Sequence, residues 1–279
     1  MKELGYYNGK IGELGEMTVP MNDRACWFGD GVYEAGMCRN YHIFAIDEHV
    51  DRLYRSAGML EINIPISKAE LKAILDELVH KMDTGDLMVY CQVTRGGGPR
   101  QHAFPDGPAN LWITLRPKKI NTAEAPVSLI TDEDTRFFHC NIKTLNLIPS
   151  VMANEKARRA GCYECVFVRP GGRVTECSHS NVHIIKDGTF FTAPADNLIL
   201  PGIARAHLIR ACGRLGIPVS ETPFTKDKLF KADEIITSSS TAPCVRACSV
   251  DGKAAGMKRE DLFTVLKDAI FGEYYSETN

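Results

Sequence analysis

Lys143 is the residue whose type and setting point most directly to covalent chemistry. It stands in the stretch 139–149, where its neighbours are largely residues expected in a protein interior. A lysine is almost never fully buried unless it is paired or has a covalent task. Burial would lower the pKa of its amine, and the neutral amine is the form that condenses with a carbonyl to give a Schiff base. A lysine that ends a strand and reaches water is the ordinary alternative.

Arg100 and His102 lie two residues apart in the loop 96–105, which contains three glycines and two prolines. Arginine is suited to two-pronged recognition of a carboxylate, and the histidine can present a second donor beside it. We therefore expect this pair to bind an anionic group. The alternative is a mobile loop whose charges are solvated.

Glu176 lies in a polar cluster, 174–181, between a predicted turn and a predicted strand. An acid, two serines and an asparagine in so short a span indicate the wall of a pocket. A buried carboxylate needs a cationic partner, so Glu176 is expected to pair with a positive group. A capped turn is the alternative interpretation of this cluster.

Two further segments have the features of phosphate sites. A Pro-Gly pair at 201–202 opens a predicted helix, and the free N–H groups near Ile203 and Ala204 would form an anion site there. Ser239 and Ser240 belong to a run of four hydroxyl side chains that follows a predicted strand. These hydroxyls are able to hold a phosphate.

The elements that must position these residues are predicted by turn, capping and periodicity signals. Asn8-Gly9 and Gly12 indicate a hairpin over 6–20. Further strands are predicted at 32–39, 42–45, 87–95, 109–115, 127–130, 164–168, 182–185, 189–192 and 234–237. Helices are predicted at 47–60 with Asp47 as N-cap, from the capping box Ser67–Glu70 onward, and at 150–160, 203–215 and about 259–274.

Two residues on the first of these elements are candidates for the same site. Tyr33 begins a strand, where its hydroxyl can point into a cleft, or it is a core tyrosine after a tight turn. The glycines on both sides of Asp30 predict a backbone that another group approaches closely. Arg52 lies off the apolar face of its helix, so its guanidinium would reach either solvent or an anion.

The polar segment 116–126 contains two prolines and is the best candidate for an interdomain linker. We expect a small N-terminal α/β domain over 1–116, a linker over 117–126, and a larger C-terminal domain over 127–279 that carries Lys143. The predicted fold class is α+β.

The composition favours small-molecule chemistry. The chain has 279 residues, of which 44% are hydrophobic and 24% charged, and its net charge of -2 gives no basic face for nucleic acid or an anionic membrane. No apolar run is long enough to cross a bilayer and the start lacks the apolar core of a signal peptide, so a cytoplasmic location is expected. The ten cysteines are irregularly spaced, which favours reduced thiols. Nothing completes Cys162–Cys165 as a redox or metal motif, so no metal is expected.

Five motifs occur in an order that resembles the fold-type IV pyridoxal-phosphate enzymes, the family of D-amino-acid and branched-chain aminotransferases and aminodeoxychorismate lyase. They are Phe28-Gly-Asp-Gly-Val-Tyr-Glu34, Glu48-His-Val-Asp-Arg-Leu53, Lys143-Thr-Leu-Asn146, Thr175–Asn181 and Pro201–Arg205. The resemblance extends over nearly the whole chain. Val93-Thr-Arg-Gly96 and Pro99–His102 are most similar to the substrate-carboxylate loop of the D-amino-acid enzymes.

The resemblance implies a fold with the cofactor cleft between two α/β domains, a homodimer, and pyridoxal 5'-phosphate as cofactor. It implies that Lys143 forms a Schiff base with the cofactor and that Glu176 faces its ring nitrogen. It further implies the following roles: Arg52, Ile203, Ala204 and Ser239 or Ser240 at the phosphate, and Tyr33, Arg100 and His102 at the substrate carboxylate.

The activity implied is transfer of the amino group of a D-amino acid, such as D-alanine, to a 2-oxo acid, such as 2-oxoglutarate, by a ping-pong mechanism. A branched-chain L-aminotransferase or an aminodeoxychorismate lyase of the same family is the nearest alternative. A cofactor-free aldolase that uses Lys143, or a cysteine-based binding module, is the alternative from other classes.

Overall fold

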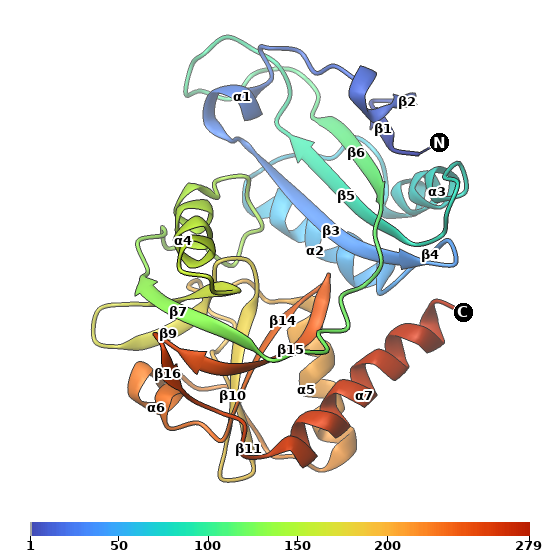
Figure 1. The fold of residues 1–279 in the computed structure, drawn as a ribbon. Coiled ribbons are helices and arrows are strands. Elements are labelled where there is room, and N and C mark those ends of the chain that lie inside the picture. Colours follow the sequence, from blue (N-terminus) through green and yellow to red (C-terminus); the bar gives the residue numbers. More distant parts are fainter. Residues whose placement is uncertain (1) are drawn as a thin grey trace. The chain divides into compact units, whose positions relative to one another are not determined.

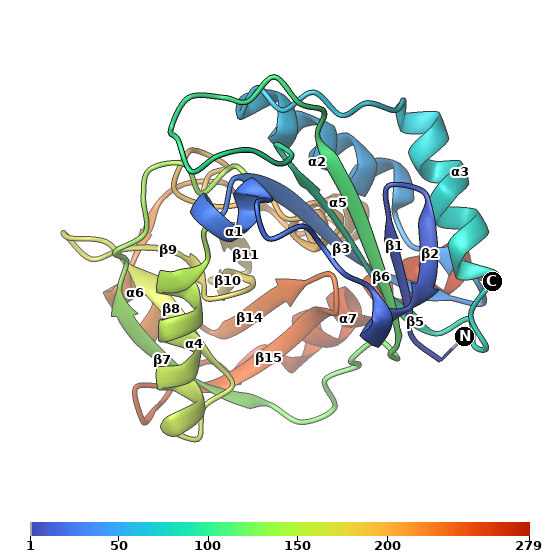
Figure 2. The same cartoon turned by 90° about the horizontal axis from the view of Figure 1, so that it is seen from above.

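The computed structural model describes residues 2–279, which form two compact units. One unit comprises the residues up to Ile120 together with Ile142–Asn146 and Tyr274–Asn279. The other comprises Asn121–Asn141 and Leu147–Glu273. We call them unit 1 and unit 2, and Figures 1 and 2 show the elements of each.

Unit 1 contains a six-stranded sheet in which every neighbouring pair is antiparallel, in the order β2-β1-β6-β5-β3-β4. Its strands are β1 (Leu4–Tyr7), β2 (Lys10–Glu13), β3 (Gly31–Arg39), β4 (His42–Ile43), β5 (Leu87–Thr94) and β6 (Asn110–Pro117). Its helices are the 3₁₀ helix η1 (Leu14–Glu16), α1 (Arg24–Phe28), α2 (Ile46–Met59) and α3 (Lys68–Val79).

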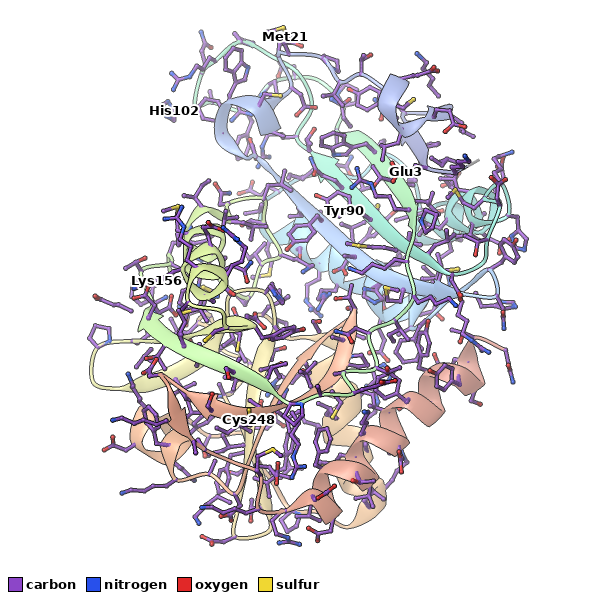
Figure 3. The ribbon with its side chains drawn as sticks, viewed as in Figure 1. Glu3, Met21, Tyr90, His102, Lys156 and Cys248 are labelled. Atoms are coloured by element: carbon purple, nitrogen blue, oxygen red, sulfur yellow. The ribbon has the colours of Figure 1, made fainter. Side chains whose placement is uncertain are left out.

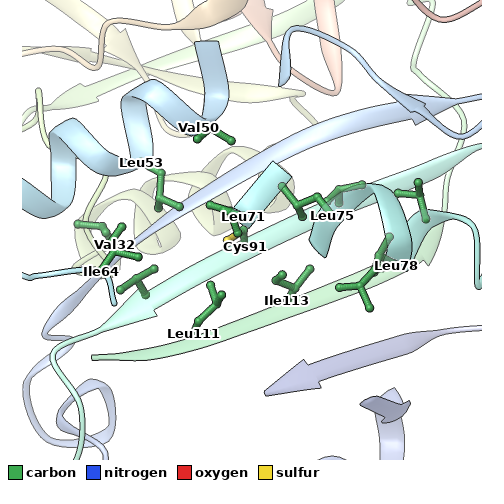
Figure 4. Close-up of a cluster of buried hydrophobic side chains, with 14 of the residues drawn as sticks. Val32, Val50, Leu53, Ile64, Leu71, Leu75, Leu78, Cys91, Leu111 and Ile113 are labelled. Atoms are coloured by element: carbon green, nitrogen blue, oxygen red, sulfur yellow. The ribbon is translucent and has the colours of Figure 1, made fainter. Parts of the chain in front are cut away.

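The core of unit 1 lies between α2 and α3 and one face of this sheet (Figure 4). Val50 and Leu53 of α2 and Leu71, Leu75 and Leu78 of α3 are buried there, as the spacing of apolar residues in both segments predicts. Residues of β3, β5 and β6 supply the opposite side: Val32, Cys91, Leu111 and Ile113. Tyr33 on β3 and Arg52 on α2 are therefore carried by elements that pack on the same core.

Unit 2 contains a ten-stranded mixed sheet in the order β12-β11-β10-β14-β15-β7-β8-β9-β13, with β16 paired to β15. Its strands are β7 (Val127–Glu133), β8 (Glu164–Val168), β9 (Arg173–Cys177), β10 (Asn181–Lys186), β11 (Thr189–Thr192), β12 (Val219–Ser220), β13 (Phe224–Thr225), β14 (Glu234–Ser239), β15 (Ala242–Val250) and β16 (Lys253–Ala254). The helices are α4 (Ile148–Arg159), α5 (Ile203–Leu215), α6 (Lys226–Phe230) and α7 (Glu260–Glu277), the last of which ends in unit 1.

These elements confirm the predicted α+β class, because antiparallel pairs predominate and the helices are not regularly interleaved with the strands. The hairpin at Asn8-Gly9 and the capping box of Ser67 and Glu70 are also present as predicted. All ten cysteines are free. Within residues 2–279, no helix is long and apolar enough to cross a membrane.

Two expectations about the chain need correction. Asp47 is not the N-cap of α2: the cap is Ala45, whose φ of 51° closes the preceding turn, and Asp47 lies in the first helical turn. The expected domain boundaries also differ from the compact units, because Lys143 groups with unit 1 rather than with the C-terminal part. Hydrogen bonds between its segment and β3 are the physical reason. The boundary after Ile120 does fall inside the predicted linker.

Candidate active site

Lys143 is held against the start of β3. Its carbonyl accepts a hydrogen bond from Tyr33 N at 3.0 Å, and Leu145 N donates to Gly31 O at 3.1 Å. On the other side, Lys143 N donates to Ser56 Oγ on α2 at 3.3 Å. The side chain is half-buried, and its Nζ lies 4.2 Å from the centroid of the Tyr33 ring. Main-chain bonds thus fix the base of the lysine, while its amine rests on an aromatic face.

Gly31 makes the close approach of these segments possible. A Cβ atom at this position would lie 2.6 Å from Val93 O and 2.8 Å from Leu145 Cδ1. Any side chain here would therefore push apart β3, β5 and the lysine segment. This confirms the expectation of a closely approached backbone beside Asp30.

Arg52 is buried, and its anionic partner is a residue of the protein. Its Nε and Nη2 donate to the two oxygens of Glu34 at 2.7 and 2.8 Å. His49 Nδ1 lies 2.7 Å from Glu34 Oε2, and because a carboxylate only accepts, Nδ1 carries the proton. Arg52 and His49 lower the pKa of Glu34 to about 2, against the opposing effect of burial. Glu34 thereby fixes the plane of the Arg52 guanidinium.

Arg100 and His102 lie in an exposed loop that packs on α1, and Figure 3 labels His102 there. The Phe28 ring is their common neighbour: the Arg100 guanidinium is 5.6 Å from its centroid and the His102 ring 5.3 Å. Tyr33 instead stacks on Tyr90 of β5, with ring centroids 5.5 Å apart. Within unit 1, the structure thus joins Tyr33 to Lys143 and Arg100 to His102.

Glu176 lies in unit 2 on β9, a strand that the sequence prediction missed. It forms an ion pair with Arg136, and its Oε2 accepts hydrogen bonds from Asn181 Nδ2 at 3.0 Å and Leu200 N at 2.9 Å. Burial raises the pKa of Glu176, and the Arg136 guanidinium opposes that effect. All three groups aimed at the carboxyl are donors, which suits its ionised form. The predicted cationic partner is therefore present.

Asn181 connects Glu176 to the start of α5. Its Nδ2 also donates to Leu200 O at 3.0 Å. A Cβ atom on Gly202 would lie 2.0 Å from Asn181 Oδ1, so only glycine lets the chain enter the helix this closely. Within residues 2–279 no side chain caps α5, and its first amides, including those of Ile203 and Ala204, begin at this point.

The serine run at the end of β14 lies beside the same residues. Ser238 pairs with Asn181 across the β10–β14 ladder, and its Oγ is 2.8 Å from Nε2 of the buried His183. Ser239 Oγ accepts from Ala242 N at 3.2 Å. Ser239 and Ser240 are both half-buried. The structure therefore brings Glu176, the start of α5 and the serine run into one part of unit 2.

Sequence reasoning missed the charged residues that support the candidates. Their shared property is an ion pair made by a side chain that is at most 12% exposed: Arg24, Asp30, Glu34, His49, Arg95, Asp134 and Arg136. Charged residues inside otherwise apolar stretches, such as Glu34 in β3, were the available signal.

Three known proteins are similar to this chain over nearly its whole length. A D-alanine aminotransferase of Bacillus licheniformis is 38% identical over 277 residues, which cover 96% of this chain and 97% of that protein. The crystal structure of a branched-chain amino acid aminotransferase of Escherichia coli is 25% identical with a TM-score of 0.92, covering 100% of this chain and 96% of the other. A branched-chain aminotransferase of T.th., solved with pyridoxamine 5'-phosphate, is 25% identical with a TM-score of 0.86, covering 97% and 94%.

The family model for class IV amino-transferases matches residues 31–250. The match begins at β3 and continues through Lys143 and Glu176 to the end of β15, so it includes the site candidates of both units. The sequence motifs, the two sheets and the relatives agree on one assignment: the chain belongs to the class IV aminotransferase family.

Proposed function

We propose that the protein is a pyridoxal 5'-phosphate-dependent aminotransferase that moves the amino group of a D-amino acid to a 2-oxo acid. The observation that carries the reaction class is Lys143, an amine on an aromatic face whose main chain is fixed on two sides. The identity to a D-alanine aminotransferase over nearly the whole chain favours D-amino acids over the branched-chain alternative.

The residues present suit the chemistry of this cofactor. A phosphate needs donors, and the start of α5 offers amides that no side chain caps among residues 2–279. A protonated ring nitrogen needs an anion, and Glu176 is a buried carboxylate held by three donors. An aldehyde needs an amine, which Lys143 supplies.

Each residue would act through its own chemistry. When bound, pyridoxal phosphate supplies a ring that accepts the electron pair left when the substrate Cα loses its proton. The Lys143 amine would remove that proton and return it to a neighbouring carbon. Glu176 would accept a hydrogen bond from the ring N–H, and its ion-pair partner Arg136 opposes the rise in its pKa that burial causes. Arg52, Ile203, Ala204 and Ser239 or Ser240 would hold the phosphate.

Substrate handedness would follow from the carboxylate clamp. Only the Cα hydrogen that points to Lys143 can be removed, so the side on which the carboxylate is held selects one enantiomer. Tyr33, Arg100 and His102 are the proposed clamp. Arginine and a ring donor provide the paired, charge-assisted hydrogen bonds that a carboxylate accepts.

Borohydride reduction followed by peptide mapping tests the lysine. We expect the label on Lys143, and Lys143→Ala should abolish both covalent labelling and amino transfer. Lys68→Ala is the matched control, because this lysine is half exposed and pairs with Asp51 on the surface. A label on another lysine, or on none, would refute the proposal.

Incubation with 2-oxoglutarate and either D-alanine or L-leucine separates the two aminotransferase activities. D-alanine should be consumed and L-leucine should not. Arg100→Ala should raise the KM for D-alanine while the absorbance of the bound cofactor stays unchanged. A preference for L-leucine would establish the branched-chain alternative. Conversion of aminodeoxychorismate without an oxo acid would establish the lyase.

We further propose that the protein is a homodimer. The start of α4 exposes three apolar side chains at helical spacing, Ile148 at 73%, Val151 at 56% and Met152 at 65%. Residues three and four apart lie on one helix face, and an exposed apolar face of this kind favours association. Sedimentation should give a dimer that Val151→Lys weakens.

The cytoplasmic location remains a prediction that the ten free thiols support.

A further inference from the structure

Asp30 joins two arginines that come from different parts of unit 1. Its Oδ2 accepts from Arg24 Nε at 2.7 Å and from Arg95 Nε at 2.9 Å. The three side chains are only 5%, 12% and 10% exposed for Arg24, Asp30 and Arg95, respectively. We call these three residues the Asp30 cluster. Because water is largely excluded, the carboxylate is needed to neutralise two guanidinium groups.

The far end of Arg24 holds the main chain of the loop that carries Arg100 and His102. Its Nη1 donates to Gln101 O at 2.7 Å and to Ala103 O at 3.1 Å. The carbonyls on either side of His102 thus converge on one guanidinium. Since a guanidinium is planar and rigid, the bond from Nε to Asp30 also fixes the direction of Nη1.

Arg95 attaches the same loop at a second point. Its guanidinium lies 3.6 Å from the centroid of the Phe104 ring, and it donates to the carbonyls of Leu60 and Glu61 at 2.6 and 3.1 Å. The carbonyls belong to the two residues that follow α2, so Arg95 connects the loop to the helical layer of unit 1. Both attachments share the carboxylate of Asp30.

Phe28 provides the platform for the functional side chains. It lies one helical turn after Arg24 on α1, and the Arg24 guanidinium is 4.8 Å from its ring centroid. The same ring contacts Arg100 and His102 at the distances given above. On this short helix, Arg24 therefore binds the main chain of the loop, and Phe28 contacts the side chains of Arg100 and His102.

We propose that Asp30 and Arg24 are positioning residues that set the pose of Arg100 and His102 for the substrate carboxylate. The inference rests on the proposed clamp function of those two residues. Both lie on an exposed loop, where holding a long side chain in one geometry costs conformational entropy. Arg24 removes part of that cost by fixing the carbonyls between and beside them, and Asp30 holds Arg24 in place.

The test uses Asp30→Asn and Arg24→Lys in the complete, cofactor-loaded enzyme. Asparagine leaves the two arginines without a neutralising charge, and lysine keeps a charge near Asp30 but cannot donate in two fixed directions. We expect KM for D-alanine and for 2-oxoglutarate to rise together by about tenfold, because both carry the carboxylate, with kcat changed less than about twofold. Arg116→Lys is the matched control, since this arginine is 61% exposed.

Amide hydrogen exchange of residues 100–104 provides a measurement that does not depend on catalysis. Both variants should accelerate exchange in this segment, while Arg100→Ala and Arg116→Lys should not. If exchange in Asp30→Asn and Arg24→Lys is unchanged, the positioning role is overturned. It is also overturned if exchange is faster in these variants but their KM is unchanged, while Arg100→Ala does raise KM. If Arg100→Ala itself leaves KM unchanged, the clamp of the proposed function fails instead. If Asp30→Asn does not fold, Arg24→Lys provides the test in its place. The urea unfolding midpoint of Arg24→Lys is measured to show that this variant is folded.

Discussion

Replacement of Glu34 by glutamine should destabilise unit 1 strongly, although the two side chains have nearly the same shape. Glu34 accepts two hydrogen bonds from Arg52 and one from His49, and its side chain is 6% exposed. Glutamine would turn an –NH₂ toward groups that also donate. It would leave the Arg52 guanidinium buried without an anion, which is the costly way to break a buried ion pair.

The pKa of Glu34 gives the magnitude of this effect. Its partners hold the pKa at about 2 rather than 4.5. At about 1.4 kcal/mol for each pH unit, this corresponds to about 3 kcal/mol of stability at neutral pH. Because the folded-state pKa is depressed, the contribution is fully present above pH 4.5 and is lost as the pH falls toward 2. Removal of one member of a buried ion pair typically costs about 3–5 kcal/mol, which agrees.

Urea unfolding followed by tryptophan fluorescence measures the loss of stability in unit 1. The sequence has two tryptophans, Trp27 and Trp112, and both belong to unit 1. Glu77→Gln is the matched control in unit 1: Glu77 forms an ion pair with Lys81, but their side chains are 62% and 39% exposed, so solvent screens the pair. Glu34→Gln should lower the free energy of unfolding and flatten its dependence on pH between 4.5 and 2. Equal effects of the two substitutions would refute the reasoning.

Three further outcomes are expected. Ser67→Ala should lower the free energy of unfolding of unit 1 by about 1 kcal/mol in the same fluorescence assay, because it removes the capping box of α3. Gly202→Ala should weaken cofactor binding in an absorbance titration, because the new Cβ would displace Asn181, whereas Gly213→Ala within α5, with no atom within 4 Å of its Cβ, should not. Burial lowers the pKa of His183 to about 3, so stability should fall as the pH drops from 6.5 toward 3, and His183→Gln should reduce this slope, as measured by circular dichroism of thermal unfolding.

Local signals in the sequence predicted the elements that depend on neighbouring residues. The Asn8-Gly9 turn and the Ser67 capping box involve residues at most three positions apart, and both are present in the structure. The start of α2 was misplaced because Ala45 adopts a left-handed conformation that its own side chain does not favour. That conformation depends on packing between distant parts of the chain, which the residue type does not reveal.

The site shows the same division. Lys143, Glu176 and the start of α5 could be proposed as candidates from the sequence, because each belongs to a short motif of neighbouring residues. Their supports could not: Arg24 bonds to Gln101, 77 residues away, and Arg136 pairs with Glu176, 40 residues away. Strand β9 was missed for the same reason, since its polar residues are buried only because distant charges satisfy them.

The division of the chain into units has a consequence for biosynthesis. The backbone passes from one unit to the other after Ile120, Asn141, Asn146 and Glu273. Unit 1 is therefore incomplete on the ribosome until residues 274–279 have been made, because Tyr274 packs against Met37 and Phe44 of its N-terminal part. A nascent chain stalled before residue 274 would contain the lysine segment but would lack the Tyr274 side chain that packs on the N-terminal part of unit 1. Neither unit could be produced as one continuous fragment.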